Sequence, residues 1–350
     1  MSLKPTISIC IPTFNRADYL EQALQSLAQQ TIKPFEVIIV DNASTDNTPQ
    51  IAAKYKKLGF TYVRNPKNLG MVGNYNRCLE LARGQYLSFL HSDDLISPTW
   101  QETWLETIAN HPADFYTCSI CIINQHNQPL FIYHTFNHDC LIPAGQVLRQ
   151  LLLHHCPIIA PTAATVFKTS LLRKIAPFKT KLGTEADVDI FLRLSLQHSL
   201  FYKRQILFYH RSHPEQTFDT KKQVKSTGDR LEKIANYFTI VKDFSQTQLQ
   251  NQPYQRLFIL MNVFMTLCSP KLYLSKLKLA RKIFPDIFTQ TLDWKVFLSV
   301  QTLFIFRALL RPITGLRQNT PGQTFRQLPA EKLALRLWSH PDGRESPRRH

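Results

Sequence analysis

The sequence contains no run of about 18 uncharged apolar residues, the length that a membrane-spanning helix requires. The nearest approach, residues 296–310, is interrupted by Arg307. The chain also lacks the pattern of a secretory signal peptide, because its first five residues lead directly into a strand-like segment. Its seven cysteines are an odd number without the spacing of a disulfide framework. We therefore expect reduced thiols and a cytoplasmic protein.

Acidic residues are scarce beside basic ones, with 25 Asp and Glu against 42 Lys and Arg and a net charge of +17. Residues 220–350 hold 22 basic and 8 acidic residues, a net charge of +14, whereas residues 1–219 hold 20 and 17, a net charge of +3. A basic C-terminal third indicates an anionic partner, such as a membrane surface, nucleic acid or a phosphorylated substrate. No nucleic-acid-binding motif accompanies it, so we expect no nucleic-acid partner.

Glycine is also scarce, with 10 among 350 residues. The loop expected after the first strand, residues 12–16, contains none. A nucleotidyltransferase normally has a glycine-rich, basic phosphate loop at that point, so this enzyme class is disfavoured. Cys118 and Cys121 are spaced as Cys-x-x-Cys, but no second pair completes a zinc site.

Strands and helices alternate through the first hundred residues. The strand-like segments are 6–12, 35–40, 60–63 and 86–90, and the segments with helical spacing are 17–30, 48–58 and 75–82. This order predicts an α/β fold with a mainly parallel sheet flanked by helices. Polar loops follow the first, second and fourth strands, and these three loops should lie at one edge of the sheet. Ligands bind at that edge in open α/β sheets.

The remainder of the chain is less regular. We expect helices over residues 100–110, 145–154 and 190–197, and strands over 115–124, 130–133, 166–167 and 200–211, with a hairpin turn across 125–128. Residues 220–315 should form a basic helical extension, and residues 316–350 a partly disordered tail.

Two adjacent carboxylates, Asp93 and Asp94, stand where the strand 86–90 ends. They repel each other and lose hydration there unless a positive charge lies beside them. Mg²⁺ or Mn²⁺ meets this need, because both take oxygen ligands and leave positions for substrate phosphates. The alternative is that the pair caps a helix that starts near Pro98.

Five motifs in this order resemble those of family 2 glycosyltransferases, which are inverting enzymes with the GT-A fold. The resemblance covers roughly residues 6–215. The motifs are Ile11-Pro12-Thr13-Phe14-Asn15-Arg16, Val40-Asp41-Asn42-Ala43-Ser44-Thr45-Asp46, Asn68-Leu69-Gly70 with Asn76, Ser92-Asp93-Asp94, and Asp187 in Asp-x-Asp-Ile-x-Leu-Arg followed by His213-Pro214.

The resemblance implies a catalytic domain over residues 1–219, with a donor half of about 1–98 and an acceptor half of about 99–219. It implies that Asp187 is the general base, with Glu185 and Asp189 as alternatives, and that Asp94 and His213 hold Mg²⁺ or Mn²⁺, with His91 as a further candidate. The implied donor-binding residues are Pro12, Thr13, Asn15, Arg16, Asp41, Asn42, Ser44, Asn68, Gly70, Asn76 and Asp93.

Three positions depart from the family pattern. His91 stands where the family often has Asp, and Tyr75 stands where an Ala-Arg-Asn sequence often supplies Arg. Ala186 stands where a Glu often precedes the base, and Glu185 lies one place earlier, which is why the alternatives to Asp187 stay open.

The residue types suit sugar transfer independently of the resemblance. A bound divalent cation stabilises the charge that develops on a nucleoside diphosphate leaving group. A carboxylate on the opposite face of the sugar removes the proton of the attacking hydroxyl. Asp187 has no Lys or Arg within three positions, so its pKa should be less depressed than that of a carboxylate beside a cation.

The expected function is therefore transfer of a sugar from a UDP- or dTDP-sugar to a saccharide or lipid-linked acceptor, in synthesis of a cell-surface polysaccharide or glycoconjugate. The basic segment 220–315 favours peripheral contact with an anionic membrane at its inner face. The alternatives are a non-catalytic module that binds a nucleotide sugar or glycan, and a nucleotidyltransferase.

Overall fold

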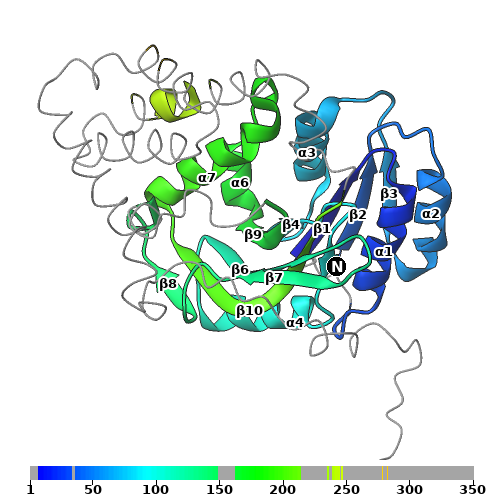
Figure 1. The fold of residues 1–350 in the computed structure, drawn as a ribbon, viewed down its shortest axis with the longest axis horizontal. Helices are drawn as coiled ribbons and strands as arrows, with labels where there is room; N and C mark the ends of the chain where they lie inside the picture. The colour runs from blue at the N-terminus through cyan, green and yellow to red at the C-terminus, as the bar shows by residue number, and fades with distance from the viewer. Residues whose placement is uncertain are drawn as a thin grey trace, which may run out of the picture.

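The computed structural model describes residues 7–33, 36–148 and 162–213, together with positions 235, 239–244, 246, 278 and 282. These residues form a curled sheet with helices on both faces (Figure 1). The expected α/β fold with a helix-flanked sheet is confirmed. The basic extension, the tail and most of the expected helix 145–154 lie outside the described residues, so those expectations stay predictions.

The strands are β1 (Ile7–Thr13), β2 (Glu36–Asp41), β3 (Thr61–Arg64), β4 (Tyr86–Phe89), β5 (Leu95–Ile96), β6 (Phe115–Ile123), β7 (Pro129–Tyr133), β8 (Cys140–Ile142), β9 (Thr165–Lys168) and β10 (Leu200–Arg211). The helices are α1 (Ala17–Ala28), α2 (Thr48–Lys54), α3 (Gly70–Leu81), α4 (Trp100–Asn110), α6 (Thr169–Ile175) and α7 (Ala186–Gln197). Short 3-10 helices are η1 (Lys56–Leu58), η2 (Thr162–Ala164) and η3 (Thr180–Glu185).

The sheet has two parts with different pairing. Its strand order is β3-β2-β1-β4-β9-β6-β10-β5. Strands β3, β2, β1 and β4 are parallel, as expected, and lie side by side in Figure 1. Strand β9 then runs antiparallel to both β4 and β6, and β6 pairs in parallel with β10. The expected hairpin is confirmed, because β6 and β7 pair antiparallel across the turn.

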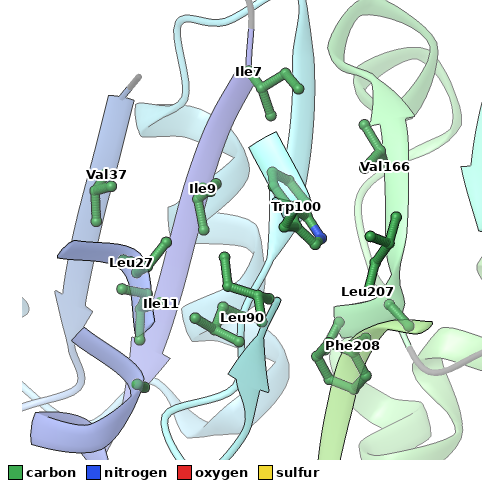
Figure 2. Close-up of a cluster of buried hydrophobic side chains, with 14 of the residues drawn as sticks. Ile7, Ile9, Ile11, Leu27, Val37, Leu90, Trp100, Val166, Leu207 and Phe208 are labelled. Atoms are coloured by element: carbon green, nitrogen blue, oxygen red, sulfur yellow. The ribbon is translucent and has the colours of Figure 1, made fainter. Parts of the chain in front are cut away.

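Alternate residues of β1 face two separate hydrophobic clusters, as the two-residue period of a strand requires. Ile7, Ile9 and Ile11 pack in a cluster with residues of α1 and α4, and Figure 2 shows part of this cluster. Cys10 points to the opposite cluster, which residues of α3, α6 and α7 complete. Strands β1, β2 and β4 are thus buried on both faces, which explains their nearly continuous apolar sequences.

Two helices begin earlier than the sequence pattern indicates. Helix α3 begins at Gly70. The sequence pattern indicates a start at residue 75 because the preceding residues include glycine and asparagine, which are poor helix formers. Helix α7 begins at Ala186 instead of residue 190, which puts Asp187 in its first turn. An acidic residue is favourable there because it faces the positive end of the helix dipole. The short elements α6, β5 and β8 were not anticipated.

Within the ranges described above, no helix has the length and apolar character needed to cross a bilayer.

A buried carboxylate joins the amino-terminal ends of three parallel strands. Glu36, at the start of β2, accepts hydrogen bonds from the Ser8 hydroxyl, from the Arg83 backbone N–H at 2.9 Å and from Arg83 Nε at 2.6 Å. Ser8 Oγ in turn accepts a hydrogen bond from the N–H of Gly84 at 2.7 Å. Burial acts to raise the pKa of Glu36, but the contacts with Ser8 and Arg83 outweigh it and lower the pKa. These hydrogen bonds join β1, β2 and β4 at the sheet edge opposite the polar loops.

We expect Glu36→Gln to lower the free energy of unfolding at pH 7 by about 1–3 kcal/mol, because charge-assisted hydrogen bonds are lost. The folded-state pKa of Glu36 is lowered, so its contribution is present above the unfolded-state pKa and is lost as the pH falls through the folded-state pKa. Urea unfolding should therefore show that the difference in unfolding free energy between the wild-type protein and Glu36→Gln becomes smaller from pH 7 to pH 3. Glu80→Gln, at an exposed ion pair with Arg77, is the control. If the difference in unfolding free energy between wild type and Glu36→Gln does not change with pH, the stabilising role given to the Glu36 carboxylate is contradicted.

Candidate functional site

The loops that follow β1 and β2 are tied together at the carboxyl ends of these strands. Thr13 and Asp41 are in register, and the N–H of Asn42 donates to the Thr13 carbonyl at 2.9 Å. The N–H of Asn15 donates to Ser44 Oγ at 2.9 Å, and Asn15 Oδ1 accepts from the N–H of Thr45 at 2.8 Å. Five of the expected donor-binding residues therefore lie in one small area at the sheet edge.

Asp41 is fully buried and already makes four contacts within the protein. Its Oδ1 accepts from the N–H and hydroxyl of Ser44 at 2.9 and 2.5 Å. Its Oδ2 accepts from the Tyr62 hydroxyl at 2.6 Å and lies 3.4 Å from Arg64 Nε. Burial and the charge of Asp41 raise the pKa of Tyr62 well above its usual range. A ligand that bonds to Asp41 must therefore displace Tyr62 or Arg64.

Asn42 attaches the glycine turn before α3 to the same loops. Its Nδ2 donates to Asn68 Oδ1 at 2.7 Å and to the Gly70 carbonyl at 3.2 Å. Its Oδ1 accepts from the N–H of Leu69 at 2.8 Å. Gly70 has a φ of 74°, a conformation that favours glycine, so this turn depends on the residue type that the motif supplies.

Asn76 faces away from these loops and joins α3 to the segment before η3. Its Nδ2 donates to the Phe178 carbonyl at 3.0 Å, and its Oδ1 accepts from the Phe178 N–H at 2.9 Å. Both polar groups of its side chain are thus engaged with the second half of the domain. The expected donor contact of Asn76 would require breaking this pair.

The side-chain hydroxyl of Thr13, at the carboxyl end of β1, is available to bond a ligand. The residue is buried, and among the described residues its Oγ1 has no hydrogen-bond partner. Buried hydroxyl groups are nearly always hydrogen-bonded, so this position suits a polar atom of a ligand.

Asp94 lies in the turn between β4 and β5 and is fully enclosed. Its Oδ1 accepts from the backbone N–H of Arg211 at 2.8 Å and lies 3.1 Å from Nδ1 of His210. Its Oδ2 lies 3.2 Å from Nδ1 of His91. Burial acts to raise the pKa of Asp94, but the contacts with His210 and His91 outweigh it and hold the pKa far below its usual range. The turn of residues 91–94 is the acidic turn, and Asp94 joins it to the end of β10.

Asp93 is the more accessible of the two carboxylates. Its side chain retains 19% exposure, and its Oδ2 lies 3.0 Å from Nε2 of His213. The ring of His213 packs against that of Tyr19, with 4.5 Å between the centroids. Ligand atoms of His91, Asp93 and Asp94 lie within 4.8 Å of one another, so the cluster can supply the donor atoms of a cation site. Two carboxylates with nearby imidazoles suit Mg²⁺ or Mn²⁺.

Arg211 is buried beneath the acidic turn and connects four elements. Its Nε donates to the Asp93 carbonyl at 2.7 Å, and its Nη2 donates to Gln22 Oε1 of α1 at 3.2 Å. Its Nη1 donates to the side chain of Asn127 at the tip of the β6–β7 hairpin. The guanidinium carbon lies 5.3 Å from the ring centroid of Tyr19. The buried positive charge stabilises the adjacent carboxylates and fixes the backbone that carries them.

The two carboxylates of α7 have different surroundings. Asp189 is buried and forms ion pairs with Lys179 Nζ at 2.8 Å and with Arg193 at 2.5 Å. Asp187 is half-buried, and its Oδ1 accepts from the N–H of Val188 at 2.8 Å. Asp189 is thus engaged by two cations within the protein. The side chain of Glu185 lies outside the described residues.

Tyr75 is affected by the charge of Asp187 on α7 and by the charges of Asp93 and Asp94 in the acidic turn. Burial raises its pKa well above the usual range, and the charges of Asp187, Asp93 and Asp94 raise it further. These three carboxylates therefore act on the same hydroxyl, although almost a hundred positions separate Asp187 from the others. The charge of Asp187 on α7 and the charges of Asp93 and Asp94 thus act in the same direction on the pKa of Tyr75.

Sequence reasoning missed Tyr75, His210 and Arg211. A signal for the last two was present: the apolar strand 200–211 ends in His210-Arg211, just as the strand 86–90 ends in polar residues. The signal for Tyr75 was its departure from the family pattern, which indicated no role because a tyrosine on a helix is ordinarily a core residue.

Residues 8–173 match the sequence pattern of glycosyl transferase family 2. The chain is 29% identical over 208 residues to the uncharacterised protein MT1568 of Mycobacterium tuberculosis, covering 57% of this chain and 65% of that protein. It is also 29% identical over 223 residues to an uncharacterised glycosyltransferase of Rickettsia typhi, covering 62% and 67%. A Bacillus subtilis protein assigned to teichuronic acid biosynthesis, TuaG, is 33% identical over 129 residues, covering 36% and 51%. The matches thus span about two thirds or less of these relatives.

Two solved structures have a similar fold at low sequence identity. The complex of Staphylococcus aureus TarS 1-349 with UDP-GlcNAc superposes with a TM-score of 0.55 at 18% identity, covering 79% of this chain and 90% of that one. The mannosyltransferase PcManGT of Pyrobaculum calidifontis, in complex with GDP-Man and Mn²⁺, gives a TM-score of 0.52 at 15% identity, covering 90% and 82%. The fold is accordingly GT-A.

We expect Arg211→Lys to lower the free energy of unfolding by about 2–3 kcal/mol, because the planar fork that bonds Asp93, Gln22 and Asn127 is lost while the charge remains. Urea unfolding measures this. Arg77→Lys, on the exposed face of α3, is the matched control and should change stability by less than about 0.5 kcal/mol. Equal effects of the two substitutions would contradict the role given to Arg211.

Proposed function

Because residues 8–173 belong to glycosyl transferase family 2, we propose that the protein transfers a sugar from a nucleotide-diphosphate donor to a hydroxyl group of an acceptor. The observation that carries this proposal is that the loops after β1 and β2 and the acidic turn follow adjacent parallel strands. Tyr75, which is bonded to His91, is in addition subject to the charge of Asp187 on α7. An enzyme that transfers a sugar needs a nucleoside site, a diphosphate site and a general base close to one another.

Asp93 and His213 are the residues we propose to hold Mg²⁺ or Mn²⁺. Asp93 keeps an exposed face and lies 3.0 Å from His213, whereas Asp94, the ligand that the resemblance implies, is enclosed by His91, His210 and the Arg211 N–H. We therefore assign Asp94 to the orientation of the turn. The cation, when bound, supplies Lewis-acid stabilisation of the diphosphate leaving group.

The nucleoside half of the donor would lie over the ends of β1 and β2. The hydroxyl of Thr13, which has no partner within the described part of the chain, and the loop around Asn15 and Ser44 supply polar contacts there. TarS holds UDP-GlcNAc and PcManGT holds GDP-Man, which supports a nucleotide sugar as the donor. We favour a UDP- or dTDP-sugar, with Tyr62 and Arg64 shifting to admit an imide to Asp41.

Asp187 is the proposed general base. It removes the proton of the acceptor hydroxyl as that oxygen forms a bond to the anomeric carbon, while the bond from that carbon to the diphosphate oxygen breaks. A single displacement of this kind inverts the anomeric centre. The ion pairs of Asp189 with Lys179 and Arg193 support Asp187 over Asp189 for this role.

The acceptor is proposed to be a saccharide or a lipid-linked saccharide of a cell-surface polymer. The relative TuaG, assigned to teichuronic acid biosynthesis, supports this class. Peripheral membrane contact through the basic residues 220–315 is part of the same proposal and rests on their charge. The alternative is a module that binds a nucleotide sugar without transferring it.

The purified protein should hydrolyse or transfer from at least one nucleotide sugar in a panel of UDP-, dTDP- and GDP-sugars with Mn²⁺. Addition of EDTA should abolish this activity, and Mn²⁺ or Mg²⁺ in excess should restore it, because the diphosphate then leaves with its charge stabilised. Release of nucleoside diphosphate is the measurement. Binding of a nucleotide sugar without release, under all metal conditions, would favour the non-catalytic alternative.

Asp187→Asn should keep donor affinity and lower the rate of sugar transfer by about 10²–10⁴-fold, because only proton removal is lost. Calorimetric titration with the donor and a transfer assay separate these two quantities. Glu80→Gln, an exposed carboxylate of α3, serves as the control. If Asp187→Asn transfers sugar at the normal rate, another group is the base and Glu185 becomes the next residue to test.

A further inference from the structure

A chain of hydrogen bonds runs from α3 to the acidic turn. The Tyr75 hydroxyl is bonded to Nε2 of His91, and Nδ1 of His91 lies 3.2 Å from Oδ2 of Asp94. Asp94 in turn accepts from the N–H of Arg211 at 2.8 Å. The chain therefore begins in a helix, passes through the turn and ends at β10, so it spans both parts of the sheet.

Both ring nitrogens of His91 are engaged in this chain. Whichever nitrogen carries a proton, Nε2 faces the Tyr75 hydroxyl and Nδ1 faces Asp94. An imidazole that ligates a cation must offer it a nitrogen lone pair, and His91 could do so only by releasing one of these partners. His91 is thus arranged to orient a carboxylate, as groups around metal ligands commonly are.

Tyr75 is held firmly enough to serve as the anchor. It is buried, its ring meets Phe89 edge-on with 4.8 Å between centroids, and it packs against Phe178 at 5.6 Å. The Phe178 backbone is itself fixed by its two hydrogen bonds with Asn76. Tyr75 and His91 are also two of the positions at which the sequence departs from the family pattern, and the structure shows that they contact each other.

We propose that Tyr75 and His91 are positioning residues that fix Asp94, and through the turn that Asp94 anchors, hold the carboxylate of Asp93 in place for the divalent cation. This inference rests on the proposed function for its meaning in sugar transfer, but its geometry concerns cation binding by the protein alone. Groups of this kind typically change metal affinity about 10- to 100-fold when removed.

Three substitutions separate the links of the chain. Tyr75→Phe removes only the hydroxyl. His91→Gln keeps an amide near the position of Nε2 and loses the contact with Asp94, whereas His91→Asn keeps a donor near the position of Nδ1 and loses the contact with Tyr75. Tyr55→Phe is the matched control, because it removes a buried hydroxyl at the end of α2, where Tyr55 donates to the Glu21 carbonyl at 3.3 Å.

Mn²⁺ affinity of the purified full chain, measured from the electron paramagnetic resonance of free Mn²⁺ without any donor, is the main readout. We expect Tyr75→Phe and His91→Gln to weaken Mn²⁺ binding about 10-fold or more. His91→Asn, which loses the same link as Tyr75→Phe, should weaken it to a similar extent, and Tyr55→Phe should leave it unchanged. The double variant Tyr75→Phe/His91→Gln should bind about as weakly as the weaker single variant, because the residues act in series. Thermal unfolding verifies that each variant is folded.

The nitrogen couplings of bound Mn²⁺, recorded by electron spin-echo methods, distinguish positioning from direct ligation. His91→Asn should leave the imidazole signal in place, since we assign that signal to His213. Loss of the signal in His91→Asn, or normal Mn²⁺ affinity of folded Tyr75→Phe, would overturn the inference. Failure of the wild-type protein to turn over any nucleotide sugar would instead count against the proposed function, because Mn²⁺ binding is measured without a donor.

Discussion

The buried carboxylate of Asp94 is the constraint on which the arrangement of the site depends. A charge that is removed from water requires compensating partners, and here they are two imidazoles and a backbone N–H. These partners come from opposite parts of the sheet, His91 from the turn after β4 and His210 and Arg211 from the end of β10. Satisfying one buried charge therefore brings the two parts of the sheet together at the edge where the polar loops lie.

The same coupling extends through hydrogen bonds to uncharged groups. Arg211 bonds the Asp93 carbonyl, α1 and the β6–β7 hairpin, and Asn76 bonds the Phe178 backbone. A sugar donor bound over the carboxyl ends of β1 and β2 would consequently lie beside residues that come from the second half of the domain, after residue 98. In the proposed reaction, this explains how Asp187 on α7 can act on an acceptor at the donor's sugar. Both hydrophobic clusters, one on each face of the sheet, contain residues of the two halves.

Much of the donor side could be predicted because its signals are local. Each parallel strand is an apolar run that ends in polar residues, so β1, β2, β4 and the acidic turn follow from the printed sequence. The second half follows less well, because its antiparallel strand β9 and the short strands β5 and β8 are defined by pairing with distant segments. The roles of His210, Arg211 and Tyr75 depend on contacts across more than a hundred positions for the first two, and no local pattern reveals such contacts. Asp187 and Asp189 have similar local sequence, and the deeper burial of Asp189 and its ion pairs with Lys179 and Arg193 appear only in the structure.

Anomalous diffraction from crystals that contain Mn²⁺ and a nucleoside diphosphate tests the central claim most directly. The account predicts one Mn²⁺ peak bound by Asp93 beside His213, with the diphosphate on the ion and the nucleoside over the carboxyl ends of β1 and β2. A peak at another face of the protein, or a nucleotide bound away from Thr13 and the acidic turn, would contradict it.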